Sequence, residues 1–528
     1  MKAFLMYRDR DFGLNEDHPS NTTDLMQDLE LGTLLHVMAA GDEFLGEVAK
    51  KAVLGSLREP EAILYRQRVL ADCQEWPDVV RDLYAIAVEA IEREKRVWGW
   101  MSPKYPESTL YRSVEVLQIF VGLIKKLRQI ADKHSDKFRS EGFRRFFDML
   151  STELNDEYLE LIEDHLERLR FRNGTLISAE LGQGNMGVNY ILRKPFYTRR
   201  NLIDRVQKWL EQTVSEDSQE QVYEVHERDE AGFRALSDLR GQGICHVVTA
   251  LAQSTDHILS FFNMLRLELG FYVSCLNLRD QLVRKRESLC FPKPLPADRP
   301  MLTCQGIYDV CLSLRMDESV VGNDVTGDHM RLIMITGANR GGKSTLLRSV
   351  GLAQLMMQCG MFVAAKVFTA NLCDGIFTHF KREEDASMKS GKLDEELSRM
   401  SVIVGKITPR SIVLFNESFA STNEREGSEI ARQIVRALLE AEVKVFYVTH
   451  MFDLAQGFYL AKSADTLFLR AERLTDGQRT FRLIPGEPSP TSYGGDLCRR
   501  IFGDSILPTN RPSVSAPSEI KGWQRVQR

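Results

Sequence analysis

The chain of 528 residues is longer than a single hydrophobic core usually supports, so it should divide into about three folding units. Hydrophobic residues make up 43% and charged residues 27%, a balance that excludes wholesale disorder and low-complexity fibres. The 69 Lys and Arg against 74 Asp and Glu give a net charge of −5, which excludes a histone-like polycation. Any binding of nucleic acid therefore requires local basic patches.

Cysteine spacing and apolar runs indicate the compartment. The nine cysteines form no C-x-x-C pair, which disfavours a disulfide framework or a zinc ribbon and favours a reducing environment. The first residues, MKAFLMYRDRDFG, contain no apolar run typical of a signal peptide. The most apolar long segment, 258–278, carries Arg266 and Glu268, charges that are costly in lipid. We expect a cytoplasmic protein without a membrane partner.

Residues 1–130 have the pattern of a helical core. Apolar side chains recur every three or four residues from 24 to 72, which predicts consecutive amphipathic helices. A lever region, 131–240, follows, in which one apolar stripe between Glu and Arg residues predicts a long helix. That stripe consists of Leu154, Tyr158, Leu161, Ile162, Leu166 and Leu169.

A small β element interrupts the helices at about residues 171–200. Asn173-Gly174 is a turn signal, and the β-prone run 188–192 follows it. Helical periodicity returns from Leu202, and residues 241–320 complete the helical core and connect it to the next domain. The long helical regions on either side of the β element could act as arms.

The second half, 321–505, alternates short strands with helical stretches. Its β-prone runs occur at 332–336, 411–415, 443–449 and 465–471. This alternation is typical of a sheet with helices on its faces, so the predicted fold class is α/β plus α. Residues 506–528 are rich in Pro and Ser and lack periodicity, which predicts a disordered tail.

A phosphate-binding loop follows the first β-prone run. The segment TGANRGGKST matches G-x-x-x-x-G-K-[ST] and leads into a helical run. In such a loop backbone N–H groups turn onto phosphate oxygens, Lys343 neutralises their charge, and Ser344 can ligate Mg²⁺. A glycine-rich turn without a ligand is the alternative, which the flanking strand and helix disfavour. The predicted nucleotide-binding residues are Gly337, Ala338, Asn339, Arg340, Gly341, Gly342, Lys343, Ser344 and Thr345.

Two further strand ends carry polar residues. The run 411–415 ends at Asn416-Glu417, where a Walker-B strand has a Mg²⁺-orienting Asp and a water-activating Glu. Asn416 is neutral, so we expect it to hold Mg²⁺ less strongly than a carboxylate and to slow turnover. Glu417 is the predicted general base, against the alternative of a solvated loop carboxylate. His450, after 443–449, could contact the γ-phosphate or the attacking water, although a lone His is more often structural.

These ordered motifs resemble those of the MutS family of DNA mismatch-repair ATPases, a branch of the ABC-type ATPases. TGANRGGKSTLLR is similar to the family's TGPNMGGKST, and NESFASTNEREG, 416–427, occupies the place of DEIGRGTSTYDG. Residues 374–378 resemble the segment before the signature loop, and SGKLDE, 390–395, takes the place of STFMVE. Further matches are Asn323-Asp324, Thr449-His450, Ser492-Tyr493-Gly494 and the P-x-x-I-x-x-R pattern within 60–70.

The resemblance covers roughly residues 20–505 and implies a homodimer with composite sites, in which Ser390 of one subunit reaches the nucleotide of the other. It also implies ATP and Mg²⁺ as cofactors, helical lever arms, and a clamp-like insertion at 171–200 that closes on DNA. Nucleotide state would then shift the arms between open and closed clamps.

Some positions depart from the family pattern. The core-like pattern begins by about residue 23, which leaves no room before it for the family's N-terminal domain with its mismatch-reading Phe-x-Glu wedge. The chain's only Phe-x-Glu is Phe415-Asn416-Glu417 of the ATPase strand. Gly391-Lys392 and Phe419-Ala420 also differ from the family residues. We expect a divergent member that does not read mismatches by the wedge.

Basic residues flank the β element. Arg193, Lys194, Arg199 and Arg200 could contact DNA phosphates, and a solvated helix face explains them equally well. A second basic stretch, 125–145, has interleaved acids and carries less weight.

The working hypothesis is a cytoplasmic, homodimeric, Mg²⁺-dependent ATPase that clamps DNA in mismatch repair or recombination. Lys343, Ser344 and Asn416 hold the nucleotide and metal, Glu417 activates water, His450 senses the γ-phosphate, and Ser390 acts in trans. A nucleotide-gated dimeric scaffold with little hydrolysis, acting on protein partners, is the alternative. A P-loop kinase or transporter ATPase is disfavoured, because the sequence offers neither an acceptor site nor an LSGGQ-like signature.

Overall fold

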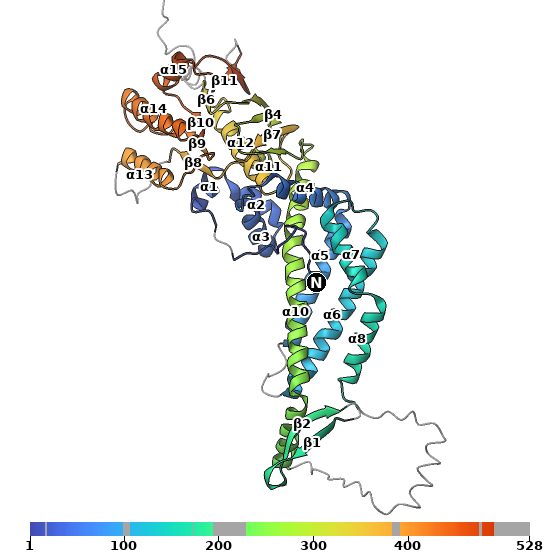
Figure 1. Cartoon of the computed structure of the whole chain (residues 1–528). Coiled ribbons are helices and arrows are strands. Elements are labelled where there is room, and N and C mark those ends of the chain that lie inside the picture. Colours follow the sequence, from blue (N-terminus) through green and yellow to red (C-terminus); the bar gives the residue numbers. More distant parts are fainter. Residues whose placement is uncertain are drawn as a thin grey trace, which may run out of the picture.

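The computed structural model describes residues 1–15, 18–98, 106–172, 174–193, 229–382, 391–474 and 478–489. It has an α/β head at one end and a long helical arm that ends in a two-stranded ribbon (Figure 1). The predicted helical region from Leu202 to 228, the motif at 492–494 and the tail at 506–528 lie outside the described residues.

The helical half has one group of helices near the head and another in the arm. The helices near the head are α1 (Thr22–Asp28), α2 (Leu31–Ala39), α3 (Glu43–Leu54) and α4 (Pro60–Glu75), and the arm contains α5 (Pro77–Trp98), α6 (Pro106–His134), α7 (Glu141–Thr152), α8 (Asp156–Arg168) and α10 (Glu230–Arg284). Local sequence sets several starts: the side chains of Asp42 and Ser140 accept N–H bonds as N-caps of α3 and α7, and Pro60 opens α4.

Helix α10 forms the axis of the arm. Its 55 residues span about 80 Å, and it packs against α2, α3, α5 and α6. By length and composition it contains a stretch able to cross a membrane, but 67% of that stretch is buried inside the structure. The helix also carries Arg266, whose guanidinium lies 3.8 Å from the Phe44 ring centroid, and the fully buried Glu268. These contacts agree with the predicted buried core helix at 258–278.

The arm ends in an antiparallel ribbon, as the β-prone run predicted. Strands β1 (Leu176–Leu181) and β2 (Gly187–Arg193) are joined by a 3-10 turn, η1 (Gln183–Asn185). The stripe predicted before it is partly wrong, because α8 has only 13 residues and both Tyr158 and Leu161 are exposed. This helix lies at the edge of the arm and packs mainly on α6, so only a narrow face with Leu159 and Leu166 is buried (Figure 1).

The larger sheet of the head has the strand order β12-β11-β6-β10-β9-β8, and all its pairs are parallel except β11 with β12. Its strands are β6 (Leu332–Thr336), β8 (Ile376–Phe380), β9 (Ile412–Asn416), β10 (Lys444–Val448), β11 (Thr466–Arg473) and β12 (Arg479–Pro485). The helices between them are α12 (Lys343–Gln358), α13 (Lys392–Val404), α14 (Glu424–Glu440) and α15 (Phe452–Ala461). Four strands begin within one residue of the β-prone runs, and the predicted α/β class is confirmed.

A smaller sheet has the order β3-β7-β4-β5. It consists of β3 (Lys293–Leu295), β4 (Leu302–Ile307), β5 (Asn323–Thr326) and β7 (Val367–Asn371), with the short helix α11 (Val310–Arg315) after β4. β3 and β4 fall within 241–320, predicted to be helical core and connector, yet they pair with β7 and β5. Because backbone ladders join these strands, the small sheet crosses the predicted boundary between 320 and 321.

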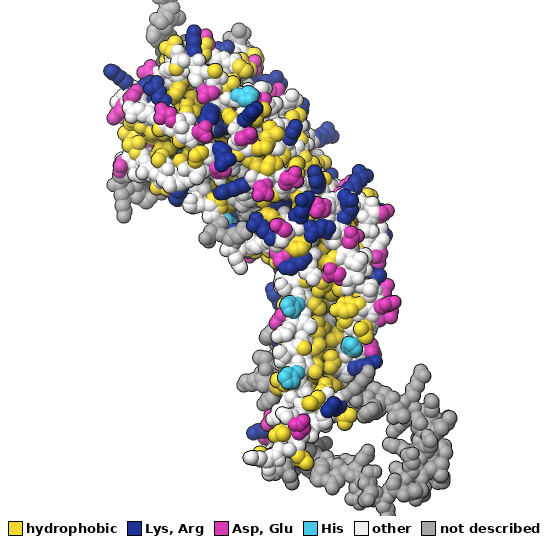
Figure 2. Space-filling view, in the orientation of Figure 1, with side chains coloured by type: hydrophobic (Ala, Val, Ile, Leu, Met, Phe, Trp, Pro, Cys, Tyr) yellow, Lys and Arg dark blue, Asp and Glu magenta, His cyan; other side chains and the backbone are white. Residues whose placement is uncertain are grey.

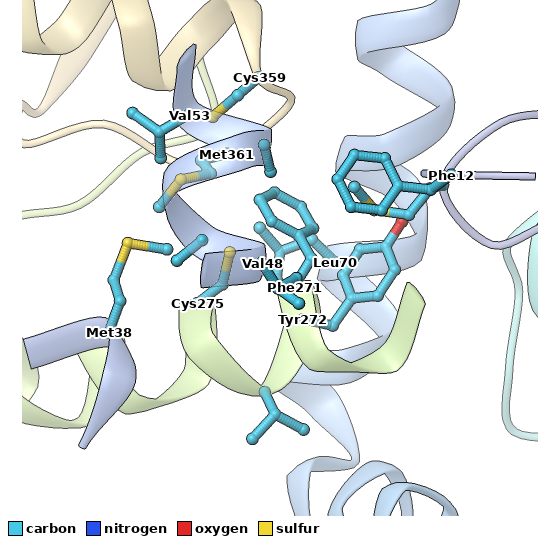
Figure 3. Close-up of a cluster of buried hydrophobic side chains, with 14 of the residues drawn as sticks. Phe12, Met38, Val48, Val53, Leu70, Phe271, Tyr272, Cys275, Cys359 and Met361 are labelled. Carbon is cyan, nitrogen blue, oxygen red and sulfur yellow. The ribbon is translucent and has the colours of Figure 1, made fainter. Parts of the chain in front are cut away.

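One hydrophobic core joins the helical half to the head. In Figure 3, side chains from the N-terminal segment, the helical half and the end of α12 meet around Phe271 and Tyr272. Arg66 of α4 is fully buried there and donates hydrogen bonds to the carbonyl oxygens of Met6 and Cys359, at 3.1 and 3.0 Å. Cys359 caps the C-terminal end of α12. The helical half therefore holds one end of the helix whose other end follows the predicted phosphate-binding loop.

Candidate nucleotide site

Three parallel strands bring their carboxyl ends to one edge of the larger sheet. β6 and β9 lie on either side of β10. Just beyond the strands, the Thr449 N–H donates to the carbonyl of Ile335 at 3.1 Å, and the Glu417 N–H donates to the carbonyl of Val448 at 2.9 Å. Backbone bonds therefore hold the three predicted strand ends together, at the edge where open α/β sheets bind ligands.

The loop between β6 and α12 has the backbone of a phosphate cradle. Its φ angle is +110° at Gly337 and +89° at Gly342, values that favour glycine. A side chain at Gly341 would place its Cβ 2.6 Å from the Cβ of Ala471 in β11. The loop can therefore lie this close to β11 only because residue 341 is glycine. Among the described residues no side chain caps the first turn of α12, which leaves its N–H groups for phosphate.

Lys343 is buried beside this loop. Its Nζ donates to the carbonyl oxygens of Gly337 and Ala338, both at 3.0 Å. Burial lowers the pKa of Lys343, and the nearby Glu417 carboxylate opposes that shift. A buried ammonium with only neutral acceptors gains from a phosphate oxygen, because the phosphate also supplies a compensating negative charge. The other predicted loop residues are the exposed Asn339 and Arg340 and the half-buried Thr345.

Ser344 and Asn416 bring two oxygens together, one at the start of α12 and one at the end of β9. The Ser344 hydroxyl donates to Asn416 Oδ1 at 2.8 Å. Hydroxyl and amide oxygens are hard donors of the kind that Mg²⁺ prefers, so the pair fits this metal. In the described ranges no three His, Cys, Asp or Glu side chains gather as a metal cluster, so Mg²⁺ here would depend on nucleotide oxygens as well.

Glu417 and His450 form a pair beside these oxygens. Glu417 Oε1 and His450 Nε2 are 2.6 Å apart, and the two side chains are 30% and 29% exposed. The hydrogen bond from His450 lowers the pKa of Glu417, burial raises it, and the charges of His450 and Lys343 lower it further. The carboxylate is kept ionised and open to solvent, the state that a general base requires. Glu417 also has a φ of +57°, a strained backbone of the kind that clusters at functional sites.

The β11–β12 hairpin supplies residues that the sequence analysis did not single out for this site. Arg479 of β12 donates to the carbonyl oxygen of Asn339 in the loop, and its charge also lowers the pKa of Lys343. Asn323, noted above only as part of a motif, holds this hairpin: its side chain accepts from the N–H of Leu483 at 2.7 Å and donates to the carbonyl of Phe481 at 3.2 Å. No local signal marks Arg479, because only strand pairing brings it to the loop.

The trans site and the DNA patch are not assembled by the described residues. Ser390, Lys194, Arg199 and Arg200 lie outside them. Arg193 is exposed at the end of β2, where its Nε donates to the Ser178 hydroxyl at 2.8 Å. Both roles stay predictions.

Comparison with known families agrees with the ordered motifs. Residues 58–285 match the model of the MutS2 N-terminal domain, and residues 333–502 match that of MutS domain V. The second match contains the phosphate loop and the Glu417–His450 pair. The chain belongs to the MutS family.

MutS-family relatives from distant organisms match part of the chain. The DNA mismatch repair protein MutS of Porphyromonas gingivalis is 33% identical over 195 residues, which is 35% of this chain and 21% of that protein. The protein of the same name from Thermotoga neapolitana is 32% identical over 34% of this chain and 23% of its own length. MutS protein homolog 4 of Homo sapiens is 23% identical over 36% of this chain and 21% of that protein. The alignments thus span less than a quarter of each relative.

Proposed function

We propose that this MutS-family chain is a Mg²⁺-dependent ATPase that clamps DNA. The observation that carries the proposal is the meeting, at adjacent strand ends, of a phosphate loop, a pair of metal-suited oxygens and an ionised carboxylate. MutS proteins are ATPases, and two relatives above are named for DNA mismatch repair, which supports ATP as the ligand and DNA as the partner.

Each side chain has a role in this proposal. The loop and Lys343 bind the phosphates, and Ser344 with Asn416 holds Mg²⁺, which would neutralise charge on the phosphate oxygens. Glu417 takes the proton of the attacking water. His450 keeps Glu417 ionised through their hydrogen bond. To sense the γ-phosphate, His450 would have to exchange this bond for one to the phosphate.

The quaternary arrangement is part of the same proposal. We propose a cytoplasmic homodimer in which Ser390 of one subunit completes the nucleotide site of the other. Arg193, Lys194, Arg199 and Arg200 then contact DNA at the arm tips. The length of the arm supports a clamp, since α10 alone spans about 80 Å.

Steady-state ATP hydrolysis tests the proposal, with and without duplex, branched and single-stranded DNA. We expect one DNA form to change the rate and Glu417→Ala to abolish hydrolysis. Lys343→Ala should lose ATP binding, and undiminished nucleotide affinity in that variant would refute the phosphate-site assignment.

A nucleotide-gated scaffold is the second candidate, favoured by one observation. Asn416 gives Ser344 a neutral partner where a carboxylate would hold Mg²⁺ more strongly. ATP binding without measurable hydrolysis, together with no DNA binding at low salt, would favour this scaffold and a protein partner.

A further inference from the structure

The N-terminal segment 4–12 is fixed to the helical half by buried side chains. Glu268 of α10 accepts hydrogen bonds from the N–H groups of Leu5 at 2.6 Å and Phe12 at 3.3 Å. Tyr272, one turn further along, donates its hydroxyl to the carbonyl of Leu5 at 2.5 Å. Leu5 and Phe12 are buried, whereas Arg8, Asp9 and Arg10 between them are exposed. The segment is therefore held at two points while its middle faces solvent.

Aromatic rings support the two guanidinium groups of this segment. The Arg8 guanidinium lies 5.7 Å from the centroid of the Tyr65 ring, and that of Arg10 lies 4.3 Å from the centroid of Tyr7. A cation–π contact orients the planar group without using its N–H donors. Both arginines are thus oriented; Arg8 also donates one N–H to Glu141 at 2.7 Å, and its remaining N–H groups and those of Arg10 can bind an anion.

Two other stretches bring arginines to the same place. Arg58, between α3 and α4, lines a hollow of about 580 Å³ together with Arg8 and Arg10. Arg145 of α7 donates to the carbonyl of Arg8 at 2.7 Å, and its neighbour Arg144 donates to the carbonyl of Arg139 at 2.5 Å. We name Arg8, Arg10, Arg58, Arg139, Arg144 and Arg145 the junction arginines, and all six are exposed. Figure 2 shows Lys and Arg side chains gathered where the arm meets the head.

Carboxylates also lie near the junction arginines, and Asp72 accepts the backbone N–H of Arg139 at 3.0 Å. Glu141 lies 2.7 Å from Arg8 and 3.9 Å from Arg145, so two cations share it. Three more acids, Asp9, Glu59 and Glu61, line the hollow. Within the described part of the chain, Arg10 and Arg58 form no ion pair. By contrast, Lys125, Lys126 and Arg128, which begin the basic stretch 125–145 that ends with Arg144 and Arg145, each bond a carboxylate, at 2.7, 3.3 and 2.7 Å.

We propose that the junction arginines bind the phosphate groups of a nucleic-acid strand. Arginine suits this role, because its planar fork matches two phosphate oxygens at once. The choice of nucleic acid as the source of the phosphates rests on the proposed function. The surface itself is new, because that function uses the arm tip.

The two surfaces are well separated along the arm. Glu268, which anchors the N-terminal segment, is 25 residues along α10 from Gly243, which lies against Ile177 of the ribbon. At 1.5 Å per residue this is about 40 Å, or roughly twelve base pairs of duplex. A duplex of about 30 base pairs is therefore long enough to reach both surfaces, whereas probes shorter than about twelve base pairs can engage only one.

Fluorescence anisotropy of the full chain with labelled oligonucleotides tests the inference. Binding of a duplex and a single strand of about 30 nucleotides is measured without ATP, from about 50 to 200 mM KCl. Arg8→Gln/Arg10→Gln/Arg58→Gln should weaken binding about tenfold at 100 mM KCl and lower the slope of log K against log[KCl] by about 2 to 3, since each duplex phosphate contact contributes about 0.9. The triple Arg→Lys variant should keep most of the slope and bind more weakly than wild type.

A matched control removes the same charge elsewhere. Lys406→Gln/Arg436→Gln/Lys462→Gln changes three exposed cations of the head and should bind as wild type does. Circular dichroism melting checks that each variant is folded. If wild type binds no oligonucleotide at low salt, both this inference and the DNA part of the proposed function fail.

Other outcomes overturn the inference alone. One is wild-type affinity for the oligonucleotide in the triple Gln variant, and another is an equal loss of affinity in the control variant. A third is displacement of the labelled oligonucleotide by millimolar pyrophosphate as effectively as by unlabelled oligonucleotide, which would assign the hollow to a small phosphate ligand.

Discussion

Replacing Asn416 by Asp tests the metal side of the site directly. Asn416 is half-buried, and its Oδ1 accepts the Ser344 hydroxyl at 2.8 Å. Asp has nearly the same shape, so the substitution adds a negative charge beside that hydroxyl at little steric cost. The added charge should favour Mg²⁺ bound with the nucleotide and should also raise the pKa of the neighbouring Glu417.

The expected change in Mg²⁺-dependent ATP affinity follows from the position of Asn416 next to the Ser344 hydroxyl, which is suited to bind Mg²⁺. Outer partners of a metal site change metal affinity or activity by about 10- to 100-fold, and a charge-assisted hydrogen bond is about twice as strong as a neutral one. We therefore expect Mg²⁺ to raise the ATP affinity of Asn416→Asp about 10- to 100-fold more than it raises that of wild type, a difference of about 1.4 to 2.8 kcal/mol.

Equilibrium binding of a fluorescent ATP analogue measures this difference. Each protein is titrated in EDTA and in excess Mg²⁺, and the ratio of the two affinities is compared. Asn416→Ala serves as the control, because it removes the acceptor and should lower the ratio below that of wild type. Equal ratios in the Asp variant and wild type would show that Asn416 does not limit Mg²⁺ binding and would refute the reasoning.

The remaining predictions concern catalysis and stability. Glu417→Gln should lower ATP turnover by about 10²- to 10⁴-fold with little change in ATP affinity, and turnover near wild type would remove Glu417 as the base. His450→Ala should move the acid limb of the kcat–pH profile to higher pH, because the hydrogen bond that lowers the pKa of Glu417 is lost; an unmoved limb would contradict this. Burial raises the pKa of Glu268 from 4.5 to about 7, so between these values the folded protein binds more protons than the unfolded one. Its free energy of unfolding should fall by about 3 kcal/mol as pH rises through that window, and urea unfolding of Glu268→Gln should lack this slope. Arg66→Met leaves two buried carbonyls unpaired and should cost about 2 to 6 kcal/mol in urea unfolding, whereas a loss under about 0.5 kcal/mol would argue against the bonds described.

Local patterns in the sequence determined the strands and the phosphate loop. β6 and β10 are buried at every residue, so each reads as a short apolar run without needing its neighbours. The phosphate loop is equally local, because glycines with positive φ, the lysine and the hydroxyl all lie within eight consecutive residues. The order of the motifs along the chain also identified the family before any contact was known.

Local patterns were less reliable where the partner of an element decides its burial. The apolar stripe on α8 predicted a broader buried face than its edge position allows, so Tyr158 and Leu161 are exposed. The sequence predicts helical core and connector at 241–320, because strands as short as β3 and β4 carry little periodicity of their own, and only pairing with β7 and β5 defines them.

Only the tertiary structure decided which distant residues meet. Strand order places β10 between β6 and β9 and so allows His450 to bond Glu417, and hairpin pairing brings Arg479 to a loop 140 residues earlier. The junction arginines likewise come from separate stretches: the buried Glu268 fixes the segment that carries Arg8 and Arg10, Arg58 lines the same hollow, and Arg145 bonds the carbonyl of Arg8. The physical reason is the same in each case: periodicity is a property of one element, whereas the choice of neighbours depends on long-range burial and hydrogen bonding across the whole fold.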